Sequence, residues 1–132
     1  MIKIQWLESF AIGNEKIDRD HKDIIAIMQD VRSAVEDDNR PRCSALLQDL
    51  IVRAQEHFTD EEEILESVHY PDLAEHIRYH QDLLLKARAM NAICHGASAN
   101  GNLEQCFTVM AEFLIDDIIA GDLKFKSFIK EI

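Results

Sequence analysis

Histidines and carboxylates recur in this sequence at a spacing of four residues, which places side chains on one face of a helix. His57 and Glu61 form one such pair, and His76 and His80 form a second. Imidazole nitrogens and carboxylate oxygens are common ligands of iron, manganese and zinc. One such pair alone is typical of a solvent-exposed helix face. Two pairs together with further inward residues indicate a metal site.

Three further residues of ligand type fall on or near the apolar stripes of predicted helices. His21 lies four residues after Ile17 and three before Ile24, and Asp117 continues a stripe of the last helix. Asp122 follows five residues later, about 140° away on a regular helix, so the helical period leaves its direction open. Burying unpaired charges costs several kcal/mol each, and bound metal removes that cost. Four histidines and three carboxylates without a thiolate favour iron or manganese over structural zinc.

Four helices must position these side chains, because apolar residues recur at three- and four-residue spacing. The expected helices cover about residues 18–37, 41–67, 73–94 and 103–121, with Asp18 as the first N-cap. A packed arm with Trp6 and Phe10 precedes them, a loop covers 95–102, and a short helix covers 123–130. The pattern predicts an all-α fold, an antiparallel up-down four-helix bundle, with residues 1–132 as one domain.

The composition excludes several classes of protein. With 132 residues, 47% of them hydrophobic, and only four Gly and two Pro, the chain is not of a disordered type. The net charge of −11 disfavours nucleic acid and anionic membrane surfaces as partners. Cys43, Cys94 and Cys106 form no CxxC pair or even framework, which predicts reduced thiols. Without a signal-peptide pattern or a long apolar run, the sequence predicts a cytoplasmic protein with no membrane partner.

Two other metal-binding patterns fit poorly. A zinc protease helix requires His-Glu-x-x-His, but Ile77 follows His76. Ferritin-like bundles require two Glu-x-x-His motifs, and the chain has only Glu66-x-x-His69. His69 and His95 fall at or beyond predicted helix ends and are expected on the surface.

The motifs together resemble the hemerythrin family, in particular its single-domain bacterial form, over essentially the whole chain. They are Trp6 with Gly13, Ile17-Asp18-x-x-His21, His57-Phe58-x-x-Glu61-Glu62, Tyr70-Pro71 with His76-x-x-x-His80, and a final block ending in Asp122. The resemblance implies two non-heme iron ions joined by an oxo or hydroxo bridge. It assigns His21 and His57 to one iron, His76 and His80 to the other, and Glu61 and Asp122 as bridging carboxylates.

The chain departs from this family at Asp117, because the family usually has a histidine five residues before the bridging aspartate. Two alternatives follow: Asp117 binds iron as an anion, or water fills the position. An ionised Asp117 at the metal would favour the ferric state. We therefore associate this substitution with faster autoxidation, or with a shift toward sensing or peroxide chemistry.

The resemblance implies reversible dioxygen binding for storage, delivery or sensing, by a protein that is not an enzyme. Ile24, Ile25, Leu114 and Ile118 are expected to surround the dioxygen site and exclude water. The alternative is a diiron oxidase, peroxidase or ferroxidase, favoured by Asp117. A third interpretation is a metal-free bundle for protein interaction. The expected partners are dioxygen and an oxygen-using or signalling protein that the sequence does not identify.

Overall fold

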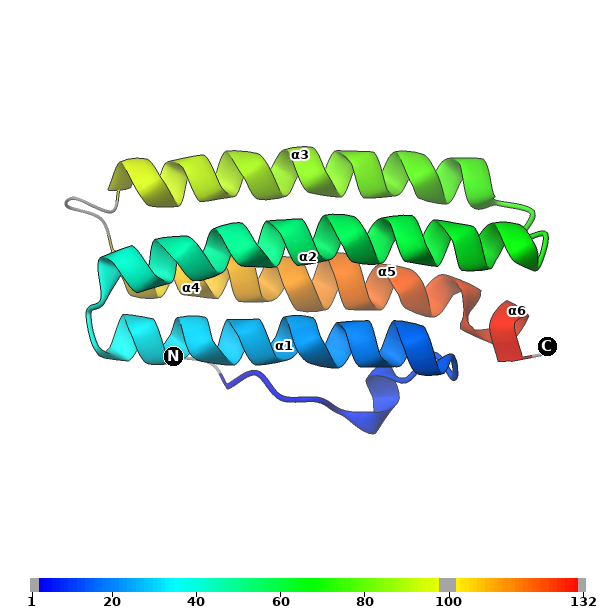
Figure 1. Cartoon of the computed structure of the whole chain (residues 1–132), viewed down its shortest axis with the longest axis horizontal. Coiled ribbons are helices and arrows are strands. Elements are labelled where there is room, and N and C mark those ends of the chain that lie inside the picture. Colours follow the sequence, from blue (N-terminus) through cyan, green and yellow to red (C-terminus); the bar gives the residue numbers. More distant parts are fainter. Residues whose placement is uncertain (1–2, 98–101, 131–132) are drawn as a thin grey trace.

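Four long helical segments form the body of the molecule in the computed structural model, which describes residues 3–97 and 102–130. They are α1 (Glu15–Glu36), α2 (Arg40–Ser67), α3 (Leu73–Ala97), and a fourth made of α4 (Leu103–Glu112), the π-helix η2 (Phe113–Ile119) and α5 (Ala120–Asp122). The turn η3 (Leu123–Phe125) leads to α6 (Lys126–Lys130). Successive segments run antiparallel (Figure 1). The predicted all-α four-helix bundle is therefore confirmed.

Asparagine side chains start three of the helices. Asn14, Asn39 and Asn102 each accept a hydrogen bond from the backbone N–H three residues later, which satisfies a donor that a helix start leaves free. Pro41 lies in the first turn of α2, where its missing N–H costs nothing. The predicted capping role of Asp18 is wrong, because α1 already begins at Glu15.

Asp18 instead joins α1 to the N-terminal arm. Its carboxylate accepts hydrogen bonds from the backbone N–H groups of Ile12 (2.7 Å) and Gly13 (3.2 Å). The arm also packs as predicted: the rings of Trp6 and Phe10 meet edge to face with centroids 5.9 Å apart. The two hydrogen bonds to Asp18 hold the arm against the outer side of α1 (Figure 1).

Two apolar clusters fill the bundle, one on each side of a polar layer. The larger cluster includes Ile24, Phe58, Leu83 and Ile118. The smaller one is made of Ile12, Ile17, Leu65, Phe125 and Ile129. On α1, α2 and the fourth segment, the histidines and carboxylates of interest lie between residues of the two clusters. The polar layer is therefore shielded from water at both ends by apolar packing.

The loop expected from residue 95 begins later than predicted, because α3 continues to Ala97. Residues 98–101 of that loop lie outside the described residues, as do the side chains of Cys94 and His95. Cys43 is a buried free thiol, whereas Cys106 is disulfide-bonded, so the prediction of reduced thiols is wrong for Cys106. None of the helices in the described ranges is both long enough and apolar enough to span a bilayer.

Candidate metal centre

Six of the seven predicted ligand residues meet in the polar layer of the bundle. They are His21 of α1, His57 and Glu61 of α2, His76 and His80 of α3, and Asp122 of α5. Each is buried, with at most 7% of its surface exposed. Their ligand atoms form two groups that share Glu61 and Asp122, and within each group all ligand atoms lie within 4.8 Å of one another.

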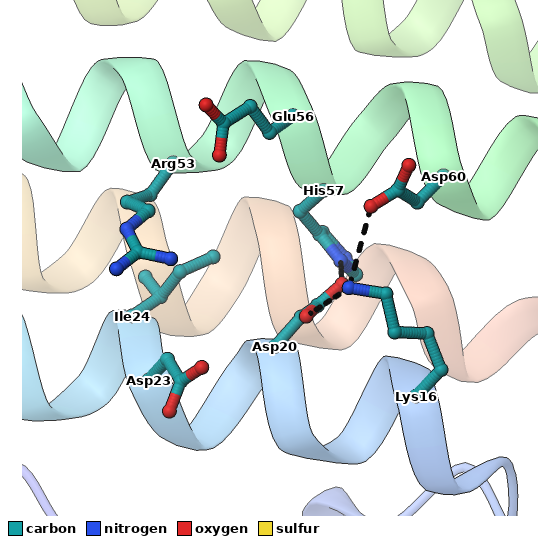
Figure 2. A pocket seen from close by; sticks show the side chains of 8 residues that line it. All are labelled: Lys16, Asp20, Asp23, Ile24, Arg53, Glu56, His57 and Asp60. Carbon is teal, nitrogen blue, oxygen red and sulfur yellow. Dashed lines mark hydrogen bonds and ion pairs between the residues drawn. The ribbon is translucent and has the colours of Figure 1, made fainter.

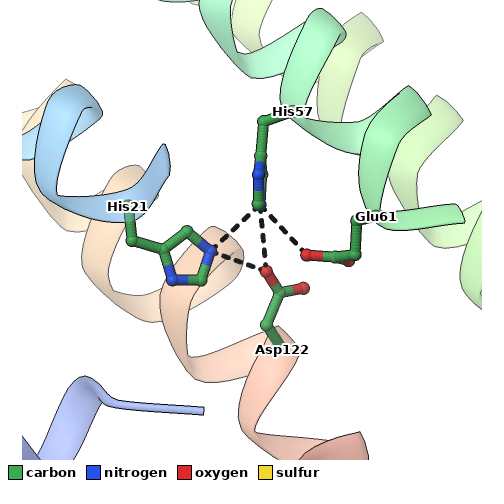
Figure 3. Close-up of side chains that lie close together, drawn as sticks. All are labelled: His21, His57, Glu61 and Asp122. Atoms are coloured by element: carbon green, nitrogen blue, oxygen red, sulfur yellow. Dashed lines mark hydrogen bonds and ion pairs between the residues drawn. The ribbon is translucent and has the colours of Figure 1, made fainter. Parts of the chain in front are cut away.

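The first group contains His21 and His57 together with the two carboxylates (Figure 3). Nε2 of His21 lies 2.8 Å from Oδ2 of Asp122, and Nε2 of His57 lies 3.3 Å from the same oxygen. Nε2 of His57 is also 3.0 Å from Oε2 of Glu61. The two Nε2 atoms themselves are 3.0 Å apart, so both rings point to one small space.

The second group contains His76 and His80 with the same two carboxylates. Nε2 of His76 lies 2.7 Å from Oε1 of Glu61 and 3.4 Å from Oδ1 of Asp122. Nε2 of His80 lies 3.0 Å from Oε1 of Glu61. The α2 and α3 pairs place these atoms together because their members are four residues apart on regular helices.

Each carboxylate divides its two oxygens between the two groups. Glu61 directs Oε2 to His57 and Oε1 to His76 and His80. Asp122 directs Oδ2 to His21 and His57 and Oδ1 to His76. The two groups are therefore joined through two carboxylates, each with one oxygen on either side.

Two of the converging atoms have no hydrogen-bond partner among the described residues: Oε2 of Glu61 and Nε2 of His80. Each lies 3.0 Å from another ligand atom without the alignment of a hydrogen bond. Buried polar atoms are rarely left unpaired, because desolvating them is costly. A cation in each group would satisfy them, and imidazole nitrogen with carboxylate oxygen is a donor set for iron, manganese or zinc. The residues present thus fit bound metal.

Asp117 lies outside both groups, and its side chain points away from them. The helical period predicts an inward direction, so this prediction is wrong. Its side chain is 29% exposed, and Oδ2 accepts a hydrogen bond from Nζ of Lys86 at 2.7 Å. The π-helix η2 explains the difference, because a π-helix has more residues per turn than an α-helix and rotates later residues relative to the stripe. The backbone returns to α-helical geometry at Ala120, and the side chain of Asp122 is buried inside the bundle.

A close contact beside Asp122 depends on the absence of a side chain at Gly121. A Cβ atom built there would lie 2.7 Å from both Cε1 and the hydroxyl oxygen of Tyr79. The Tyr79 hydroxyl also donates a hydrogen bond to the backbone carbonyl of Asp117. The ring of Tyr79 therefore packs directly on the backbone of the fourth helical segment, next to a predicted ligand.

The four predicted apolar pocket residues, Ile24, Ile25, Leu114 and Ile118, are buried in the larger cluster. Aromatic rings pack directly on the histidines. Phe58 stacks on His80 with centroids 4.1 Å apart and an interplanar angle of 9°, and Phe125 meets His76 edge to face at 5.2 Å. These rings restrict the rotation of both imidazoles and exclude water from their faces.

Two contacts of the histidines were not predicted from the sequence. Nδ1 of His57 lies 3.0 Å from Oδ2 of Asp20, and Nδ1 of His80 lies 3.1 Å from Oε2 of Glu62. The acidic run that contains Glu62 indicates only a solvent-facing helix surface, and no spacing rule links Asp20 to His57. The contacts depend on how neighbouring helices are rotated, which one-helix periodicity does not specify.

The two carboxylates alter the pKa values of the histidines in the metal-free protein. Burial alone would lower the pKa of His76, but hydrogen bonds and charge from Asp122 and Glu61 outweigh it and raise the pKa to about 9. The same balance raises the pKa of His57 well above 6.5. Burial alone would raise the pKa of Asp122, but hydrogen bonds with Glu61 and the histidines hold it well below 3.8.

The metal-free protein should therefore lose stability as pH rises. Because folding raises the pKa of His76 from 6.5 to about 9, its contribution is complete below pH 6.5 and is lost as pH rises through 9. The lowered pKa of Asp122 acts in the opposite sense, and its contribution is lost as pH falls below 3.8. Urea unfolding of chelator-treated protein between pH 6.5 and above 9 measures the first effect, and a constant midpoint would contradict it.

Comparison with known proteins matches most of the chain to a family of cation-binding domains. Residues 12–120 match the family model described as the hemerythrin HHE cation binding domain, and Asp122 lies just beyond the matched range. The matched range contains the four histidines of the two groups and Glu61.

Several curated relatives are similar over most of the chain. A myohemerythrin of Theromyzon tessulatum is 30% identical over 122 residues, covering 92% of this chain and 90% of the relative. A myohemerythrin of Sipunculus nudus is 31% identical, covering 92% and 89%. A bacteriohemerythrin of Stenotrophomonas maltophilia (strain R551-3) is 28% identical over 61% of this chain and 53% of the relative. The bacterial form is thus only weakly supported, but the chain belongs to the hemerythrin family.

Proposed function

We propose that the chain binds dioxygen reversibly at two iron ions, one in each group of the metal centre, for oxygen storage, delivery or sensing. The observation that carries this proposal is the division of each shared carboxylate, Glu61 and Asp122, into one oxygen for either group. Such carboxylates suit a bridged pair of cations better than one ion. Iron supplies the electrons for reversible dioxygen binding.

The residues of the chain have separate tasks in this proposal. His21 and His57 hold one ion, His76 and His80 hold the other, and Glu61 and Asp122 join them. The buried side chains of the larger apolar cluster, which include Leu114 and the three isoleucines predicted at the pocket, exclude water. A dry site disfavours the charge separation that would release reduced oxygen species. This supports carriage of dioxygen rather than its consumption.

The oxidase, peroxidase or ferroxidase alternative depends on Asp117 as an extra anionic ligand. Because the Asp117 carboxylate pairs with Lys86 instead, the charge argument for a ferric-favouring centre loses its basis. The proposed ligand set therefore has six residues, with Asp117 outside it. The second group then has two histidines, as the first does.

Anaerobic reconstitution with Fe²⁺ tests the proposal. We expect two Fe²⁺ per chain, and a visible absorption band that appears in air and disappears when oxygen is purged. Repeating the cycle with the His57→Ala variant provides the control, since it lacks one ligand. Saturation with fewer than two ions, or a spectrum that changes irreversibly at first contact with air, would contradict the proposal.

A cytoplasmic location stays part of the proposal. The disulfide at Cys106 favours an oxidising compartment instead, because disulfides are rare in cytosolic proteins. Fractionation of the source cells, with the thiol state of Cys106 measured in each fraction, distinguishes a cytoplasmic location from an oxidising compartment.

A further inference from the structure

In two of the four histidines, the ring nitrogen that faces away from the metal centre contacts a carboxylate. Asp20 of α1 reaches Nδ1 of His57 on α2 at 3.0 Å. Glu62 of α2 reaches Nδ1 of His80 on α3 at 3.1 Å. One such contact belongs to each group of the centre, and each joins two neighbouring helices.

The carboxylate of Asp20 is itself fixed in place. It lies in a pocket between α1 and α2, with its side chain 14% exposed (Figure 2). Nζ of Lys16 lies 2.8 Å from Oδ1 of Asp20 and 3.3 Å from Oδ2 of Asp60. The pocket also contains Asp23, which has no dashed contact in Figure 2. Asp20 is therefore held between a lysine on the solvent side and an imidazole on the buried side.

Glu62 has a comparable position at the second group. One carboxylate oxygen of Glu62 contacts His80. The Glu62 side chain is 24% exposed, so its carboxylate also lies next to water. Phe58 covers the face of the same imidazole. The orientation of the His80 ring is thus fixed at its edge by Glu62 and at its face by Phe58.

His21 provides an internal contrast. Its Nδ1 atom is buried and has no hydrogen-bond partner among the described residues. Burial alone therefore does not supply every histidine of the centre with a carboxylate. The contacts of Asp20 and Glu62 are specific features of His57 and His80.

We propose that Asp20 and Glu62 are positioning residues, each serving one of the two ions through the histidine that it holds. This inference rests on the two-ion site of the proposed function. A carboxylate that accepts a hydrogen bond from Nδ1–H fixes the proton on that nitrogen, so the lone pair of Nε2 faces the centre. It also makes the imidazole a stronger donor to the metal. Asp20 acts through His57 and Glu62 acts through His80.

The test uses Asp20→Asn and Glu62→Gln, which keep the side-chain shape and remove the charge. Asp23→Asn, from the same pocket, and Glu63→Gln, exposed on the same helix, are the matched controls. Calorimetric titration with Zn²⁺ should show two ions in every protein. In each test variant one ion should bind about 10- to 100-fold more weakly, as outer-shell changes typically cause. Both controls should match the unmodified chain.

Long-range ¹H–¹⁵N spectra of the zinc-loaded proteins identify the ion affected. In Asp20→Asn, the signal of metal-bound Nε2 of His57 should be the last of the histidine signals to appear as Zn²⁺ is added. In Glu62→Gln, the signal of metal-bound Nε2 of His80 should be the last. A variant that merely loosened the bundle would weaken both ions alike. The unmodified chain should show a slowly exchanging, downfield proton on Nδ1 of His57 and His80, which checks the proposal even if a variant fails to fold.

Three results would overturn the inference. They are test variants that bind both ions as the controls do, equal weakening of both ions, or rapid exchange of the Nδ1 protons in the unmodified chain. If the unmodified chain binds two ions in these cases, the two-ion site of the proposed function stands and only the roles of Asp20 and Glu62 fail. Fewer than two ions in the unmodified chain would overturn the two-ion site, and the inference with it.

Discussion

Glu61→Ala is expected to lose tight binding of both metal ions. Glu61 directs one oxygen to His57 and the other to His76 and His80, so its removal takes a ligand from each group at once. The loss should exceed about 100-fold in affinity, the upper end for residues that only support a ligand. Titration with Zn²⁺ or anaerobic Fe²⁺ measures it.

The control for this change is Glu63→Ala, two residues away on the exposed side of α2. It should retain two ions at the affinity of the unmodified chain. Glu61→Gln should fall between the two variants, because the amide keeps an oxygen but not the charge. Unchanged binding of two ions by Glu61→Ala would refute the assignment of Glu61 as the shared ligand.

Removal of metal is the second change with a large expected effect. In the metal-free chain the polar layer holds four imidazoles and two carboxylates, all buried and some without hydrogen bonds. Metal binds the folded state only, so each ion at 100 times its Kd adds about 2.7 kcal/mol, or about 5 kcal/mol for two. Tm should rise by roughly 4 °C per kcal/mol in a domain of this size.

Thermal unfolding with and without a chelator measures this difference. The His57→Ala/Glu61→Ala double variant is the matched control, because added metal should leave its Tm nearly unchanged. The interpretation of the chain as a metal-free bundle for protein interaction predicts another outcome. In that case metal would not stabilise the chain, and the double variant would be as stable as the unmodified protein.

The helical period predicted the inward direction of the four histidines for a simple physical reason. His21, His57, His76 and His80 lie on regular α-helices, where residues three and four apart share a face. Once the apolar stripe of each helix is known to face the core, the direction of these side chains follows. Four helices that each bury one stripe then bring them to the same layer.

The same reasoning fails on the fourth segment, because its backbone is not regular. The π-helix η2 changes the register between Leu114 and Asp122, and no apolar spacing in the sequence marks it. Asp117 was expected inward on an α-helical count and instead pairs with Lys86. The inward direction of Asp122 came from the family resemblance, since periodicity alone left it open.

Contacts between helices were beyond prediction for a different reason. Asp20 and Glu62 reach histidines on the next helix, and their partners depend on the rotation and separation of two helices. The disulfide of Cys106 likewise depends on tertiary proximity. Cysteine count and spacing carry no information about it in a chain with three cysteines.

The contact between Tyr79 and Gly121 makes the residue types allowed at these two positions depend on each other. The Tyr79 ring occupies the space where residue 121 would carry its Cβ atom. Any larger residue at 121 requires a displaced Tyr79 ring, a smaller neighbour at 79 or a shifted backbone. Such a shift would move the adjacent carboxylate of Asp122. Mutational drift at these two sites is therefore not independent.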